Sequence, residues 1–155
     1  MSPILTFRLL TGCRLSTMRG IGFLEGHSDL DAGIEFDSFG GSDEKYLRAS
    51  MDQWLDGANG PKTRFHNFKS DSEYRECFVF KCDEHRLYGF LCNPKDFDLR
   101  YQLCALCIYA VKHEHDSDRA ELKRVHEWRQ SLGAQTAIAK IYPPKLKKTR
   151  QSWKN

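Results

Sequence analysis

Six cationic side chains between residues 75 and 119 have the chemistry to hold and cleave the phosphate backbone of RNA. They are Arg75, Arg86, Lys112, His113, His115 and Arg119. RNA cleavage by side chains requires a base for the 2′-hydroxyl proton, positive charge for the pentavalent phosphate, and an acid for the leaving 5′-oxygen. Arginine offers a planar charged fork that matches phosphate, and histidine exchanges protons near neutral pH. Crowding of cations lowers the pKa of a lysine such as Lys112, which favours its use as a base.

Three apolar segments are expected to position these cations. Residues 75–81 and 86–92 read as the two strands of a hairpin, and residues 102–110 are almost wholly apolar, as in a central strand. Alternation places Arg86 and Tyr88 on one face of their strand. We expect that face to be open, with Lys112 to His115 converging on it from the end of the neighbouring strand.

The remaining segments complete an α+β pattern. Residues 34–39 alternate between apolar and polar side chains, which predicts a half-buried strand. Residues 43–56 and 119–131 show the spacing of amphipathic helices, and residues 134–141 fit either a last strand or a short helix. The predicted order is therefore strand, helix, three strands and helix. We expect a small, mostly antiparallel sheet with helices packed on one face.

A chain of 155 residues is of ordinary size for one domain with a single core. We assign residues 34–142 to this domain, residues 1–33 to an N-terminal extension and residues 143–155 to a basic C-terminal tail. The net charge is only +3, but acids gather between residues 29 and 44 and bases after residue 140. This uneven distribution fits an anionic partner such as nucleic acid.

The N-terminal segment does not have the features of a secretory signal, and no apolar run approaches the ~20 residues that span a bilayer. We therefore expect a cytoplasmic protein without a membrane association. The six cysteines should then be reduced thiols. Most of them stand in apolar strand-like segments, where cysteine behaves as a small buried hydrophobe.

Two simpler interpretations remain open at this point. A Lys-His-Glu-His run before a helix is commonly a solvated loop, and an arginine in a strand is commonly an ion-pair partner. A zinc-binding nucleic-acid module is a second alternative, because Cys104 and Cys107 have the spacing of a zinc knuckle. Strand alternation would, however, point these two thiols to opposite faces of the sheet.

Several short motifs in the right order add a family resemblance. They are Gly57–Lys62, Glu73-Tyr74-Arg75, Arg86-Leu87-Tyr88, Ile108–His113 and Glu121–Val125. Together these resemble the RelE/HigB superfamily of bacterial and phage type II toxins, particularly its phage-derived HigB-like branch. The resemblance implies a RelE-like fold and a toxin that cleaves mRNA without a metal or other cofactor, usually on the ribosome. It also implies a cognate antitoxin protein as a partner.

The resemblance also implies roles for individual residues. Arg86 would clamp the scissile phosphate, and Lys112 and His113 would match the family's paired basic residues after the core strand. His115 would supply a further cation. Arg75 and Lys81, with Tyr88 and Arg119, would contact the RNA. Histidines replace the usual lysine or arginine here, so a relative that binds RNA or a partner without cleaving it is an alternative.

Overall fold

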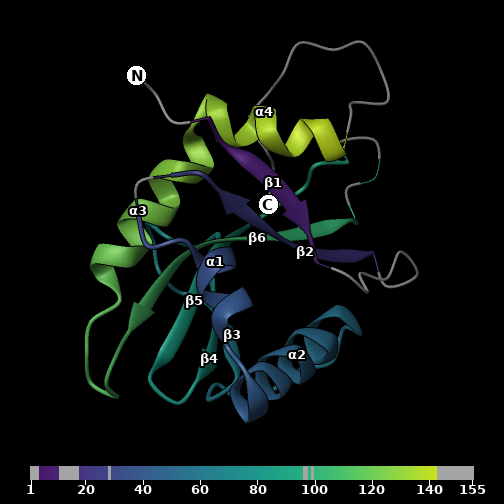
Figure 1. The fold of residues 1–155 in the computed structure, drawn as a ribbon. Coiled ribbons are helices and arrows are strands. Elements are labelled where there is room, and N and C mark those ends of the chain that lie inside the picture. Colours follow the sequence, from purple (N-terminus) through teal and green to yellow (C-terminus); the bar gives the residue numbers. More distant parts are fainter. Residues whose placement is uncertain (1–3, 11–17, 28, 96–97, 99, 143–155) are drawn as a thin grey trace.

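The computed structural model describes residues 4–10, 18–27, 29–95, 98 and 100–142 (Figure 1). The order of its elements is β1 (Thr6–Leu9), β2 (Arg19–Glu25), α1 (Ala32–Ser38), α2 (Gly41–Leu55), β3 (Phe65–Asn67), β4 (Cys77–Cys82), β5 (His85–Cys92), β6 (Gln102–Val111), α3 (Arg119–Gln130) and α4 (Leu132–Ile141). The expected tail, residues 143–155, lies outside the described residues.

The six strands form one mixed sheet in the order β1-β2-β6-β5-β4-β3. Only β2 and β6 pair in parallel; the other four pairs are antiparallel. The predicted α+β class and the mostly antiparallel sheet are therefore confirmed at this level. The hairpin of β4 and β5 and the central position of β6 also match the prediction from their apolar runs.

Helices cover both faces of the sheet, so the prediction of helices on one face was wrong (Figure 1). On one face, Val79 and Tyr88 pack with Leu122 of α3. On the other face, Phe80 packs in a core that includes Met51 of α2. The physical reason is that β4, β5 and β6 carry apolar side chains at consecutive positions, which is typical of strands buried on both faces.

Residues 34–39 were expected as a strand, but residues 34–38 belong to helix α1 and Phe39 is its C-cap. Asp31 is the N-cap, and its carboxylate accepts hydrogen bonds from the backbone N–H groups of Gly33 at 2.9 Å and Ile34 at 3.3 Å. These bonds satisfy two of the N–H groups that a helix start leaves unpaired. The local cap therefore overrides the alternating pattern. Residues 134–141, left open between strand and helix, form α4.

The described part of residues 1–33 contributes two strands to the same sheet. β2 lies beside β6, and its residues Ile21, Phe23 and Leu24 are completely buried. β1 forms the edge strand beyond β2 and contacts α4. These strands share the hydrophobic cores of the domain that we assigned to residues 34–142.

Candidate functional site

The turn between β4 and β5 forms a hollow of about 690 Å³ with the chain that follows β6. We call it the hairpin pocket. Its cationic lining comes from Lys62, Lys81, Arg86, Lys112 and His113. Acidic side chains line it too, at Asp43, Asp83, Glu84 and Glu114. The hollow therefore offers concentrated positive charge together with carboxylates that can orient it.

Lys81 and Arg86 stand directly opposite each other on β4 and β5, so both side chains project from one face of the sheet. Burial, reinforced by the nearby charges of Arg86 and Lys62, lowers the pKa of Lys81; Asp118 partly opposes this shift. A lysine in such surroundings reaches its neutral, basic form at a lower pH than an exposed one.

Main-chain carbonyls hold the Arg86 guanidinium in place. Its Nη1 donates to the carbonyl of Asp83 at 2.6 Å and to the carbonyl of His85 at 3.0 Å. In the part of the chain that the structure describes, no carboxylate pairs with it. Its other N–H groups therefore keep their capacity to bind an anion.

Lys112 and His113 each have an acidic partner. Lys112 Nζ lies 2.6 Å from Glu121 Oε1, and His113 Nδ1 lies 3.1 Å from Glu84 Oε1. The two pairs differ in exposure, because the Lys112 side chain is 17% exposed and the His113 side chain 72%. Lys112 is therefore a positioned charge at the wall of the pocket, whereas the His113 imidazole is open to solvent.

Tyr88 does not face an open sheet surface, and that expectation was wrong. It is completely buried under α3, and its hydroxyl donates a hydrogen bond to the carboxylate of Asp118. Burial, followed by this bond, raises the pKa of the phenol. Tyr88 therefore packs in the core beneath α3, on the same strand as Arg86. Its ring is not accessible for stacking against a base.

Three other predicted residues lie apart from the hairpin pocket. His115 is exposed in the turn before α3 and is not part of the lining. Arg119 Nη1 lies 2.5 Å from Asp71 Oδ2, and the guanidinium stands over the Tyr74 ring at 4.6 Å. Arg75 lines a different hollow, at the opposite end of the sheet.

Two further residues of this region, Lys62 and His66, were not predicted as site residues, although Lys62 ends the motif Gly57–Lys62. Lys62 follows a Gly-Pro turn and reaches the hairpin pocket from the loop before β3. His66 pairs in register with Val79, so it shares the sheet face of Lys81. Burial lowers its pKa, and the charge of Lys81 adds to the effect. β3 has only three residues, too few to show an alternating pattern.

The pair of thiols on which the alternative of a zinc knuckle rested does not lie together. Cys104 and Cys107 belong to cores on opposite faces of the sheet, as alternation predicts, so they cannot chelate one ion. Among the described residues, one group of potential ligands lies within 4.8 Å, made of Asp43, Cys82 and Asp83. Burial and Asp43 raise the pKa of the Cys82 thiol to about 11, which favours its protonated form.

Comparison with protein-family models, with curated proteins and with solved structures finds no match for this chain. Within the described residues, none of the helices has both the length and the apolar character needed to cross a bilayer.

Proposed function

We propose that this protein is an endoribonuclease that cleaves RNA in the hairpin pocket by attack of a 2′-hydroxyl on the adjacent phosphate. The observation that carries the proposal is the opposition of Lys81 and Arg86 across two strands, in one hollow with Lys112 and His113. These four side chains combine a lysine of lowered pKa with an arginine that no described carboxylate neutralises. A purely structural ion-pair cluster needs neither feature.

The proposed reaction follows from what each group can do. The neutral amine of Lys81 takes the 2′-hydroxyl proton while the 2′-oxygen bonds to phosphorus. Arg86 and Lys112 stabilise the negative charge of the pentavalent phosphate. The bond from phosphorus to the 5′-oxygen then breaks, and the His113 imidazolium gives that oxygen a proton. The products are a 2′,3′-cyclic phosphate and a free 5′-hydroxyl.

The resemblance to RelE/HigB toxins extends the proposal to the cellular setting. It adds mRNA as the substrate, the ribosome as the place of cleavage and an antitoxin protein as the inhibitor. The toxin activity can be tested without knowledge of the antitoxin, because an active mRNA-cleaving toxin stops growth when it is induced alone.

The test is growth and RNA integrity after induced expression of three variants. Arg86→Ala and Lys112→Ala should relieve growth arrest and reduce cleavage at least ~100-fold, because each removes charge at the reacting phosphate. Lys140→Ala is the matched control, since Lys140 is exposed at the end of α4. Cleavage should be measured with purified protein, on free RNA and on translating ribosomes.

Mapping of the cut ends separates this reaction from others. Cyclic phosphate and 5′-hydroxyl ends agree with the proposal. Cleavage that survives in Arg86→Ala, or RNA binding without any cleavage by the unaltered protein, would show that the pocket is not a nuclease site. The second result would favour the RNA-binding alternative.

A further inference from the structure

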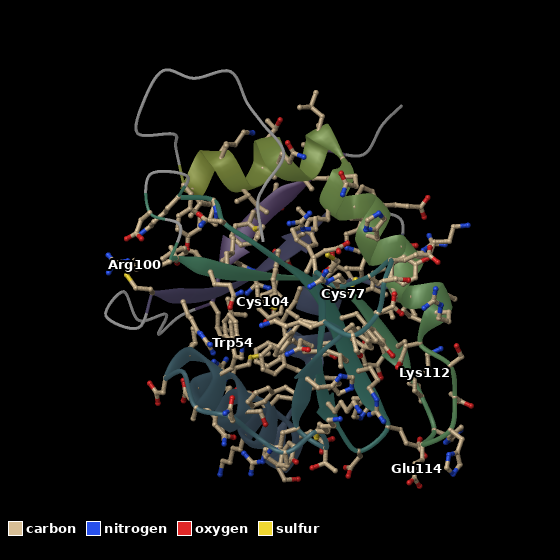
Figure 2. The ribbon with its side chains drawn as sticks, turned by 180° about the vertical axis from the view of Figure 1, so that it is seen from behind. Trp54, Cys77, Arg100, Cys104, Lys112 and Glu114 are labelled. Carbon is tan, nitrogen blue, oxygen red and sulfur yellow. The ribbon has the colours of Figure 1, made fainter. Side chains whose placement is uncertain are left out.

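A second hollow, of about 920 Å³, lies at the end of the sheet away from the hairpin pocket. It is formed where β5 ends and β6 and β2 begin, and Asn93, Tyr101 and Arg75 are among its lining residues. We call it the Asn93 pocket. Figure 2 shows the separation of the two ends, with Arg100 beside the start of β6 and Lys112 beyond its other end.

A lining residue of the Asn93 pocket has an unsatisfied hydrogen-bond acceptor. Asn93 is 9% exposed, and its buried Oδ1 has no hydrogen-bond partner among the described residues, while its Nδ2 donates to the carbonyl of Asp98 at 3.3 Å. A buried acceptor without a partner is costly, and each such group in a folded protein needs an explanation. A ligand that brings an N–H group into this hollow would supply the missing bond.

The lining of the Asn93 pocket has more cationic than acidic side chains. Arg19, Lys69, Arg75 and Arg100 line it together with Glu73 and Glu76. Arg19 lies over the Trp54 indole at 4.7 Å and donates to the Trp54 carbonyl at 2.8 Å, so its position is fixed. A ligand with an N–H donor on one part and negative charge on another matches this combination, and a nucleotide has both.

A third hollow, of about 720 Å³, lies along the edge of the sheet beside β3. It shares Arg19, Lys69, Leu91 and Gln102 with the Asn93 pocket and Lys62 with the hairpin pocket. The third hollow therefore has a wall in common with each pocket, although the two pockets share no lining residue with each other. Because the eight residues of β5 span about 25 Å, the groove that the three hollows form has the length of several nucleotides of single-stranded RNA.

We propose that the Asn93 pocket binds one unpaired base of the RNA strand that enters the hairpin pocket, and that it prefers a base with an exocyclic amino group. That amino group donates to Asn93 Oδ1, while the phosphates between the two pockets contact Lys69, Arg19 and Lys62. This inference rests on the proposed function for the identity of the strand. It adds a recognition site far from the cleaved bond.

The test measures binding of strands that cannot be cleaved. Fluorescence anisotropy at low salt uses single strands of about eight nucleotides, made of 2′-O-methyl adenosine, 2′-O-methyl cytidine or 2′-O-methyl-N3-methyluridine. The 2′-O-methyl group blocks the attacking oxygen, and the N3-methyl group removes the N–H donor of uracil. The unaltered protein should prefer the adenosine and cytidine strands. Asn93→Leu should weaken their binding about fivefold, the value of one hydrogen bond, and leave the uridine strand unchanged.

Three controls separate recognition from folding and from cleavage. Asn93→Gln keeps an amide with both an acceptor and a donor and should retain more of the preference than Asn93→Leu, whereas exposed Gln130→Leu on α3 should change nothing. Lys81→Met should abolish cleavage of ordinary RNA without changing the preference among bases. Thermal unfolding of each variant shows whether it is folded at the temperature of the binding measurement.

The outcomes distinguish this inference from the proposed function. A preference that is absent, or that persists in folded Asn93→Leu, overturns the base-binding pocket even if RNA is cleaved. Adenosine monophosphate that binds as tightly as the strand overturns the continuous groove. Failure to cleave ordinary RNA, with the Asn93-dependent preference intact, refutes the nuclease alone. Failure of every strand to bind refutes both.

Discussion

At the scale of single residues, the hairpin pocket divides its chemistry between two side chains that strand register places opposite each other. Arg86 supplies a guanidinium that main-chain carbonyls hold in place. Lys81 is partly buried beside that charge, which lowers its pKa. The closeness of Lys81 and Arg86 therefore adds positive charge to the pocket and also makes Lys81 a better base.

Lys81 should give the pH dependence of RNA cleavage a limb that rises with pH, because only its neutral form accepts a proton. In a His113→Ala background, where no imidazolium has to stay protonated, the cleavage rate should rise with a midpoint below 10.5, because the Lys81 pKa is lowered from that value. Lys81→Arg keeps the charge but does not deprotonate. We expect it to bind RNA within about threefold of the unaltered protein and to cleave at least ~100-fold more slowly. Single-turnover rates across pH measure this. An unchanged rise of the rate in Lys81→Arg would assign the base to another residue.

At the scale of elements, apolar runs predicted β4, β5 and β6 because continuous burial leaves a clear pattern in sequence. They also predicted α2 and α3 from helical spacing. Helix α1 escaped prediction because its start depends on the carboxylate of Asp31, whose two short-range hydrogen bonds carry no periodic signal. The unbroken apolar runs of β4, β5 and β6 indicate burial of both sheet faces. An open face beside Arg86 is therefore inconsistent with the pattern of its own strand.

The sequence predicts the positions of the candidate site residues only where those residues lie at the ends of strands. Arg86, Lys112 and His113 lie at the ends of adjacent strands, so the pairing of β5 with β6 brings them together. His115 comes just three residues after Lys112 but lies in the following turn, away from the pocket. Turn geometry, which the sequence pattern does not specify, decides which of these cations belong to the site.

Gly89 shows how closely β5 and β6 approach each other. The register between these strands is irregular at Tyr88 and Gly89, and a Cβ at Gly89 would lie 2.3 Å from the carbonyl oxygen of Ala105. Backbone cannot move aside cheaply, so Gly89→Ala should lower the free energy of unfolding by about 2–3 kcal/mol. Urea denaturation measures this loss.

Gly40→Ala is the matched control for this substitution. No atom lies within 4 Å of a Cβ at Gly40, and its φ of −133° suits any residue. The loss there should be no more than about 1 kcal/mol, from the weaker N-cap that alanine gives α2. Equal losses at the two glycines would mean that β5 and β6 tolerate a wider separation.

At the scale of the whole molecule, the sheet extends from the edge strand β1 to the edge strand β3, and helices from both halves of the chain cover it (Figure 1). The hairpin pocket and the groove beside β3 lie far from β1 in this order. Strand β1 therefore acts on the hairpin pocket only through the stability of the sheet, where β2 pairs with the central strand β6. Strand β2 has a direct part as well, because its Arg19 lines the groove beside β3.

Phe7 tests whether β1 is an integral part of this sheet. Its side chain is 7% exposed and its ring occupies the space beside Gly22, where a Cβ would lie only 2.2 Å from Phe7 Cζ. Phe7→Ala should lower the free energy of unfolding by about 3–5 kcal/mol, because it removes a buried ring and leaves a cavity. Leu9→Ala on the same strand is the control, since Leu9 is 36% exposed, and it should cost less than about 1 kcal/mol. Urea denaturation followed by tryptophan fluorescence compares the two variants. If Phe7→Ala costs no more than Leu9→Ala, β1 is a separable extension, and the domain assigned to residues 34–142 folds without it.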